Sequence, residues 1–425
     1  RLMEYQIPLY PRNIYLDKIT PFREDCGRIK VLTGVRRCGK SSIMELVRRQ
    51  LLTEGVPEQN LMFLNLDSKE NIGIKTKTKL RKKIDLLSRK AKEGIKYLFV
   101  DEIQNVKDFE TVINAYREEG GYSIFITGSN GYLLSGKLAT KLTGRYIEFY
   151  IGTLLFSEYI GRKKFLGKKV NPNLDAEFQE YILDGGFPKS LEYDSPEAKK
   201  NYVKSLIDEI YQKDIYANKS IRNPSAFEQI KNYVINNFGA TFSARSLAKN
   251  LSQATKTNHS RRTIYNYLSI LENAKILSKC TRFDRKSKKS LLGEEKFYLS
   301  DLSFYFATNT DTRINYGPVL ENLVYNYAKA LGYDISIGRI GKLEIDFIRN
   351  KPRNNFSYVQ VARTLDNGSY NKDGIPQTEE REYRPLETIP DNYPKYVLTM
   401  DHLLQQRNGI INLNLIDFFL DQKRF

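Results

Sequence analysis

The chain has 425 residues, of which 40% are hydrophobic and 28% charged, a composition that is ordinary for a globular protein. This length exceeds what one core needs, so we expect two to four domains. The formal charge of +18 favours polyanions such as nucleic acid, and no apolar run is long enough for a membrane-spanning helix. Three scattered cysteines argue against a disulfide framework, and no signal peptide is evident. We therefore expect a cytoplasmic protein without a membrane partner.

The segment 34–41 reads Gly-Val-Arg-Arg-Cys-Gly-Lys-Ser and fits the phosphate-binding pattern G-x-x-x-x-G-K-[ST]. An apolar strand predicted at 29–33 precedes it and a helix predicted at 42–47 follows, which is the context that the motif requires. Lys40 would reach the β- and γ-phosphates, and the Ser41 hydroxyl would ligate Mg²⁺. The expected residues around Mg²⁺ and ATP are Gly34, Val35, Arg36, Arg37, Cys38, Gly39, Lys40, Ser41 and Ser42. Because the loop binds through its backbone, we expect the two arginine side chains to point away from the phosphates.

Further apolar runs at 61–64, 97–100 and 123–127 predict buried strands of a parallel sheet with helices on both faces. Polar residues follow two of these strands, at the edge where such sheets bind ligands. Asp101 would hold Mg²⁺, and Glu102 would polarise the attacking water, which favours ATP hydrolysis. After the third strand, Asn130 or Ser129 would sense the γ-phosphate, unless these residues only cap a helix.

Arg145 lies in the segment Leu-Thr-Gly-Arg-Tyr at 142–146. Its guanidinium would stabilise transition-state charge, either within the chain or across a subunit interface, and a local ion pair is the alternative. The phosphate loop, Val-Asp-Glu-Ile-Gln, Thr-Gly-Ser-Asn and this segment, in this order, resemble the prokaryotic AAA-superfamily ATPases that carry a C-terminal domain of unknown function. The resemblance continues in Asp-Gly-Gly-Phe-Pro at 184–188, Lys-Asp-Ile at 213–215 and Glu-Ile-Asp-Phe at 344–347. It implies ATP binding and hydrolysis, with a helical lid at 156–220 packed against the nucleotide site.

Residues 221–300 contain fifteen Lys or Arg and five Asp or Glu. Helices expected at 226–238, 243–251 and 260–272, followed by a hairpin around 285–289, predict a winged helix-turn-helix. Its recognition helix would contact double-stranded DNA, because positive charge is concentrated here. The candidate DNA-binding residues are Arg261, Arg262, Tyr265 and Asn266 for the major groove and Lys288 and Lys289 for phosphates. The alternative is a winged helix that serves a protein partner or self-association.

The C-terminal segment 301–425 resembles the restriction-endonuclease-like fold, with a helix at 319–325 and strands at 341–348 and 358–362. Glu321 and Asp346 match two acids of that family, but Gln360 replaces the third acid. Ala362 stands where the family has lysine, and Arg363 falls on the opposite face of its strand. The sequence therefore predicts a degenerate, vestigial nuclease-like domain.

Together these features predict an α/β protein in which a P-loop NTPase parallel sheet with a helical lid precedes a winged helix-turn-helix and a restriction-endonuclease-like domain. The expected domains span 1–155, 156–220, 221–300 and 301–425. The expected function is Mg²⁺-dependent ATP hydrolysis that couples nucleotide state to DNA or partner binding. A nucleotide-gated switch with little turnover and an ATPase-regulated nuclease are the alternatives.

Overall fold

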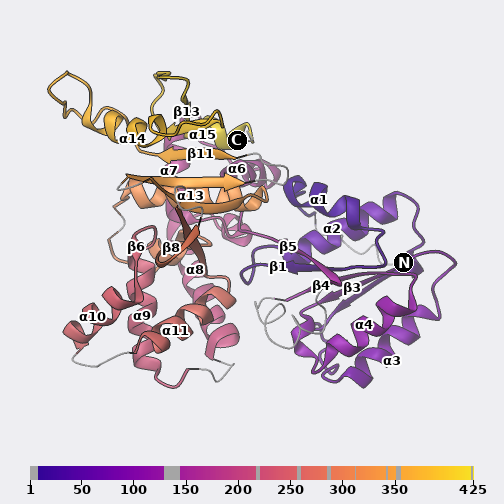
Figure 1. Cartoon of the computed structure of the whole chain (residues 1–425). Helices are drawn as coiled ribbons and strands as arrows, with labels where there is room; N and C mark the ends of the chain where they lie inside the picture. Colours follow the sequence, from indigo (N-terminus) through magenta and orange to yellow (C-terminus); the bar gives the residue numbers. More distant parts are fainter. Residues whose placement is uncertain are drawn as a thin grey trace. The chain divides into compact units, whose positions relative to one another are not determined.

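The computed structural model describes residues 8–128, 144–216, 221–255, 260–284, 289–311, 313–340, 343–350, 356–422 and 425. The chain forms two compact units (Figure 1), one of Arg1–Gly152 with Asn273–Lys275 and one of Thr153–Glu272 with Ile276–Phe425. Among the described residues, no helix combines the length and the apolar character needed to cross a membrane.

The first unit alternates strands and helices along the chain, as the sequence predicts. Its described strands are β1 (Ile29–Thr33), β2 (Leu61–Asn65), β3 (Lys96–Asp101), β4 (Tyr122–Thr127) and β5 (Tyr146–Tyr150). Its described helices are α1 (Asn13–Ile19), α2 (Lys40–Thr53), α3 (Lys77–Ser88) and α4 (Phe109–Glu119), with short 3₁₀ turns at Thr20–Phe22, Glu58–Asn60 and Ile103–Asn105. The four strands predicted from apolar runs are confirmed.

The strands of the first unit form one parallel sheet in the order β2-β3-β4-β1-β5. Strands β1 and β4 are buried along their whole length, because helices cover both faces of the sheet. Helices α1 and α2 lie on one face and α3 and α4 on the other (Figure 1). All five strands therefore end at one edge, and the loops that follow β1, β3 and β4 meet there.

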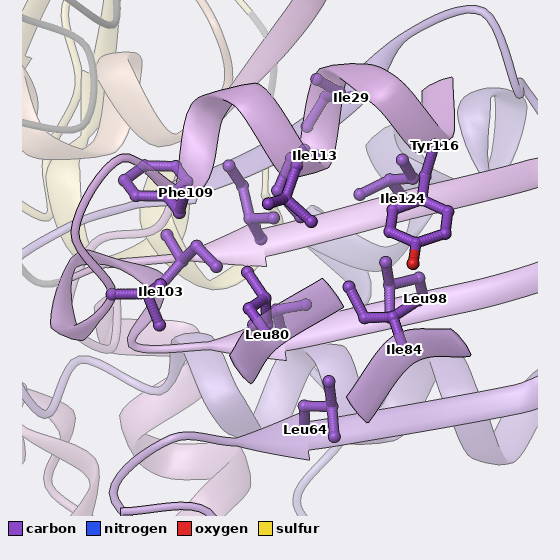
Figure 2. Packing of buried hydrophobic residues seen from close by; sticks show 14 of the residues in the cluster. Ile29, Leu64, Leu80, Ile84, Leu98, Ile103, Phe109, Ile113, Tyr116 and Ile124 are labelled. Carbon is purple, nitrogen blue, oxygen red and sulfur yellow. The ribbon is translucent and has the colours of Figure 1, made fainter. Parts of the chain in front are cut away.

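Hydrophobic packing of α3 and α4 on the sheet stabilises the positions of the strands that end at this edge. Figure 2 shows Leu80 of α3 and Ile113 of α4 directed toward the aliphatic side chains of the strands, including Leu98 and Ile124. Each of these side chains is at most 1% exposed. Burying one such side chain contributes about 1.5–3 kcal/mol, so the packing of two helices on one face fixes the strand order firmly.

The second unit contains the remaining described elements. Its helices are α6 (Phe156–Phe165), α7 (Leu174–Asp184), α8 (Pro196–Ile210) with a π-turn at Tyr211–Ile215, α9 (Pro224–Asn236), α10 (Ala244–Thr255), α11 (Arg261–Asn273), α12 (Ser303–Phe306), α13 (Tyr316–Ala330), α14 (Gln377–Glu387) and α15 (Leu415–Leu420), with a 3₁₀ turn at Pro188–Glu192. Its strands are β6 (Thr241–Phe242), β7 (Leu277–Asp284), β8 (Lys289–Leu299), β9 (Asp334–Ile340), β10 (Leu343–Asn350), β11 (Ser357–Val361), β12 (Lys395–Thr399) and β13 (Ile411–Asn414). Helices α6 to α8, in the segment predicted as a lid, group with this unit.

One sheet runs through the whole second unit, in the order β13-β12-β11-β10-β9-β7-β8-β6. The hairpin β7–β8 lies where the sequence predicts a wing, and β7 also pairs in parallel with β9 through the register Arg282↔Ile337 to Asp284↔Arg339. The predicted boundary at residue 300 therefore does not separate two sheets. Pairing β7 with β9 satisfies backbone groups that two separate sheet edges would leave open, which is the physical reason for the difference.

The segment 184–188 forms a tightly packed turn. The Gly186 N–H donates to the Asp301 carboxylate at 2.8 Å, and the Gly186 carbonyl accepts from the Leu154 N–H at 2.7 Å. A Cβ added to Gly186 would overlap the backbone of Leu154, and Gly185 has a φ of 75°. These contacts favour a plain turn over a hinge, because movement here would break buried hydrogen bonds.

We predict that Gly186→Ala lowers the free energy of unfolding of the second unit by about 2 kcal/mol, because the methyl group must displace the Leu154 backbone. Gly317→Ala in α13 is the matched control, since a Cβ there meets nothing within 4 Å. Denaturant unfolding of both variants checks the prediction, and equal midpoints would contradict it.

Candidate nucleotide site

The loop between β1 and α2 is shaped for an anion. Gly39 precedes α2 with a φ of 109°, and Gly34 has a φ of 150°, conformations that side chains rarely allow. A Cβ on Gly34 would overlap the carbonyl oxygen of Ile151. The first turn of α2 contains no acidic residue, so its N–H groups and the positive end of its dipole are left for a ligand.

The side chains of Lys40 and Arg12 stabilise the phosphate loop by hydrogen bonds to backbone carbonyl oxygens. The Lys40 side chain is buried, and its Nζ donates to the carbonyl oxygens of Gly34 at 3.0 Å and Val35 at 3.1 Å. The Arg12 Nη1 donates to the carbonyl oxygens of Cys38 and Gly152, each at 2.9 Å. The loop thus keeps its shape through backbone carbonyls. Sequence reasoning missed Arg12, because no motif marks a single arginine 26 positions before its partner.

The side chain of Thr127, at the end of β4, contacts both Asp101 and Glu102 at the end of β3. The Thr127 hydroxyl donates to the Asp101 carboxylate and accepts a hydrogen bond from the Glu102 N–H at 3.2 Å. Asp101 is 3% exposed at the end of β3. This bond is possible because β4 lies between β1 and β3 in the sheet. The sequence predicts polar site residues, Ser129 or Asn130, after this strand, but it does not identify Thr127 within the strand.

The backbone and surroundings of Glu102 are unusual. Its φ of 57° is rare for a residue other than glycine and costs about 1–3 kcal/mol, which the bond to Thr127 helps to offset. Burial raises the pKa of the Glu102 carboxyl, while the positive charges of Lys40 and Arg36 lower it. The raised pKa makes the carboxylate a better proton acceptor than an ordinary glutamate.

The remaining predicted site residues are placed as follows. Val35 and Cys38 are buried and support the loop, whereas Ser41 is exposed at the start of α2. Ser41 and Asp101 end up at the same edge of the sheet, so these residues fit a Mg²⁺ ion that also contacts a nucleotide phosphate. Ser129 and Asn130 lie outside the described residues.

Arg145 is a correction to the predicted catalytic set. It directly precedes β5, and β5 runs parallel to β1 with Tyr146 opposite Ile29. Arg145 therefore lies at the edge opposite to the phosphate loop, roughly 16 Å away along the strand. Its Nη1 donates to Asn114 at 3.4 Å, and Glu118 lies at 4.0 Å. The local-contact interpretation fits this geometry, and a role within the same chain's nucleotide site does not.

Helix α11 separates apolar and polar faces as predicted. Ile264, Tyr267, Leu268 and Leu271 are buried. The candidate DNA-binding residues Arg261, Arg262, Tyr265 and Asn266 are all exposed. Lys288 lies outside the described residues, and only the backbone of Lys289, the first residue of β8, is described.

The structure also brings together the three nuclease-like residues of the second unit. Glu321 of α13, Asp346 of β10 and Gln360 of β11 line one cavity of about 610 Å³. Ala362 and Arg363 line the same cavity. Sequence reasoning missed Lys296 of β8, whose Nζ lies 2.9 Å from Glu321 Oε2, because the two residues are joined only by the fold.

We predict that Thr127→Ala slows nucleotide turnover by roughly 10- to 100-fold, because a hydrogen bond to a charged group is worth about 1.5–3 kcal/mol. Thr127→Ser keeps the hydroxyl and should retain most turnover. Steady-state rates at saturating ATP and nucleotide affinities check this prediction together. Wild-type turnover in Thr127→Ala, or equal losses in both variants, would contradict it.

Comparison with known proteins agrees with this geometry. Residues 27–160 match the model of an AAA domain, and residues 175–313 match a domain of unknown function (DUF8612). An uncharacterized protein of Haemophilus influenzae is 30% identical over 410 residues, covering 96% of this chain and 98% of that protein. The uncharacterized protein MJ1544 of Methanocaldococcus jannaschii is 31% identical over 318 residues, covering 72% of this chain and 68% of that protein.

Two solved structures are similar at lower identity. The Walker-type ATPase of Pyrococcus abyssi is 16% identical with a TM-score of 0.48, covering 71% of this chain and 95% of that chain. The Aeropyrum pernix ORC1 protein in complex with DNA is 14% identical with a TM-score of 0.33, covering 72% of this chain and 94% of that chain. From the match over nearly its whole length, the chain belongs to the same family as the Haemophilus influenzae protein, and residues 27–160 form an AAA-type P-loop ATPase domain.

Proposed function

We propose that the first unit binds ATP with Mg²⁺ and hydrolyses it. The observation that carries this proposal is the Thr127 hydroxyl, which joins Asp101 and Glu102 at the edge where the phosphate loop also ends. For phosphate binding without hydrolysis, the phosphate loop and the N-terminus of α2 would be sufficient. Hydrolysis also requires a proton acceptor for the attacking water, and the half-buried Glu102, with its raised pKa, supplies one.

Each residue has a separate part in this reaction. The N–H groups of the phosphate loop and Lys40 bind the phosphates, and Ser41 and Asp101 would hold Mg²⁺, which neutralises developing charge on phosphate oxygens. The Glu102 carboxylate accepts a proton from the attacking water. The new bond joins the water oxygen to the γ-phosphorus, the bond to the β–γ bridging oxygen breaks, and ADP leaves. The Thr127 hydroxyl orients the Asp101 carboxylate and holds the backbone of Glu102 beside it.

We predict that Lys40→Ala loses ATP binding and turnover, because it removes the cation that meets the phosphates. Glu102→Gln should still bind ATP while its turnover falls at least about 100-fold, in line with the loss of a general base. Glu118→Gln is the control, since Glu118 is an exposed acid near Arg145 and far from the loop. Phosphate release and nucleotide binding check these variants.

Two outcomes would redirect the proposal. Wild-type turnover in Glu102→Gln would exclude Glu102 as the group that activates water. Tight ATP binding with negligible wild-type turnover, also in the presence of duplex DNA, would favour the alternative of a nucleotide-gated switch.

We propose double-stranded DNA as a partner of the second unit, and ATP turnover as the process that regulates this binding. The order α9, β6, α10, α11, β7, β8, with β8 paired to both β6 and β7, is the order of a winged helix-turn-helix. Arg261 and Arg262 begin α11 and are exposed, as are Arg245 and Lys249 of α10. Between residues 244 and 273 the single acid is Glu272. Such an uncompensated basic face favours a polyanion over an average protein surface.

We predict that the double variant Arg261→Ala/Arg262→Ala weakens duplex binding and lowers the salt dependence of the affinity by about two counterions. Lys77→Ala/Lys82→Ala on α3 removes the same charge from exposed positions and is the control. Fluorescence anisotropy at several salt concentrations measures both. An affinity that does not change with salt, or equal effects of both double variants, would contradict DNA binding and favour a protein partner for this face.

A further inference from the structure

A lysine lies among the acids of the cavity in the second unit. Lys296 of β8 is 5% exposed, and its Nζ lies 2.9 Å from Glu321 Oε2 and 2.9 Å from Glu344 Oε1. The other Glu344 oxygen accepts a hydrogen bond from Arg282 Nη2 at 2.8 Å. Glu321 and Glu344 both line the cavity. One ammonium group therefore joins a helix and a strand that are separate in the sequence.

The other polar groups of this cluster already have partners. Asp346 Oδ2 accepts from the Val361 N–H at 2.7 Å, and Gln360 Oε1 accepts from the Asp346 N–H at 2.7 Å. The Gln360 amide donates to Glu382 at 2.8 Å. Gln360, which stands in the place of the third acid, thus serves as a neutral link between β10 and α14. Such a link has no free carboxylate to offer a metal ion.

These residues do not fit the Mg²⁺ ion that the nuclease resemblance predicts. Divalent cations of this kind prefer several carboxylate oxygens. In this chain, Glu321 Oε2 is shared by Lys296 and by the Tyr298 hydroxyl, which donates at 3.1 Å. Among the residues that the structure describes, no three His, Cys, Asp or Glu side chains are arranged to hold a metal ion.

We propose that the Lys296 ammonium group is a built-in counter-ion that takes the place of a divalent cation between Glu321 and Glu344. The second unit is then stable without a metal, and its cavity is not a nuclease site. This inference is independent of ATP hydrolysis in the first unit. It also accounts for Ala362, because a lysine at that position would bring a second ammonium to acids that Lys296 already neutralises.

The charges around the cluster support this role. Burial alone would lower the pKa of Lys296, but the charges of Glu321, Asp346 and Glu344 raise it above its ordinary value. The ammonium therefore stays charged over the physiological range. Burial also raises the pKa of Asp346 well above its usual range. Without Lys296, Glu344 would keep Arg282 as its partner, but the buried Glu321 would lose the ammonium group beside it, at a cost in stability.

The test compares Mn²⁺ binding by the full chain without nucleotide, measured by calorimetry and by thermal unfolding. Lys296→Met should bind Mn²⁺ at least about tenfold more tightly than the wild type, and Mn²⁺ should raise its lowered unfolding midpoint. Lys279→Met on the neighbouring strand is the control, since Lys279 pairs with Glu295 at 3.2 Å and not with Glu321 or Glu344 among the described contacts. The control should gain no Mn²⁺ affinity, and Asp346→Asn added to Lys296→Met should reduce the gain.

Two results would overturn the proposal. One is a folded Lys296→Met protein without increased Mn²⁺ affinity. The other is a wild-type protein that binds Mn²⁺ tightly and loses this binding in Asp346→Asn, because a metal would then coexist with Lys296. The second measurement does not require Lys296→Met to fold, so it tests the proposal even if the buried acids prevent folding of that variant.

Discussion

The hydroxyl group of Thr127 binds the Asp101 carboxylate and the backbone N–H of Glu102 at the end of β3. It can do so only because β4 lies between β1 and β3 in a parallel sheet. The same order brings the phosphate loop to the same edge. Packing of α3 and α4 on one face of the sheet stabilises that order. The arrangement of the site is therefore a consequence of strand order. The Thr127 hydroxyl group at the end of β4 reaches the residues at the end of β3 because the two strands are neighbours.

Much of the first unit could be predicted from the sequence, because its signals are local. The phosphate loop spans eight adjacent residues, and Asp101 and Glu102 directly follow an apolar strand. Strand β1 begins and ends at the predicted residues, since an apolar run of this length has few other uses in an α/β domain. The apolar face of α11 was predicted for the same reason, because helical spacing alone places Ile264 and Leu268 on one side.

The features that the sequence did not predict all depend on contacts between distant segments. Arg12 reaches Cys38 through a side chain that no motif marks. Arg145 follows the polar strand end closely in sequence, yet the parallel direction of β5 carries it to the opposite edge. Lys296 lies on β8, 25 residues before Glu321, and only the fold places the two side chains together. The pairing of β7 with β9, which connects strands on both sides of the predicted domain boundary at residue 300, is invisible to local patterns.

The continuous sheet of the second unit has a mechanical consequence. Hydrogen bonds connect β6 at one end to β13 at the other without a break, and the basic helix α11 leads directly into β7. Lys296 fastens β8 of this sheet to α13, the helix that carries Glu321. Because packed interiors transmit strain and compress little, we expect a movement of α11 to be transmitted through β7 and β9 to β10, which lines the cavity. The hairpin β7–β8 and the acid-lined cavity therefore belong to one continuous sheet, with β9 between β7 and the strand β10 that lines the cavity.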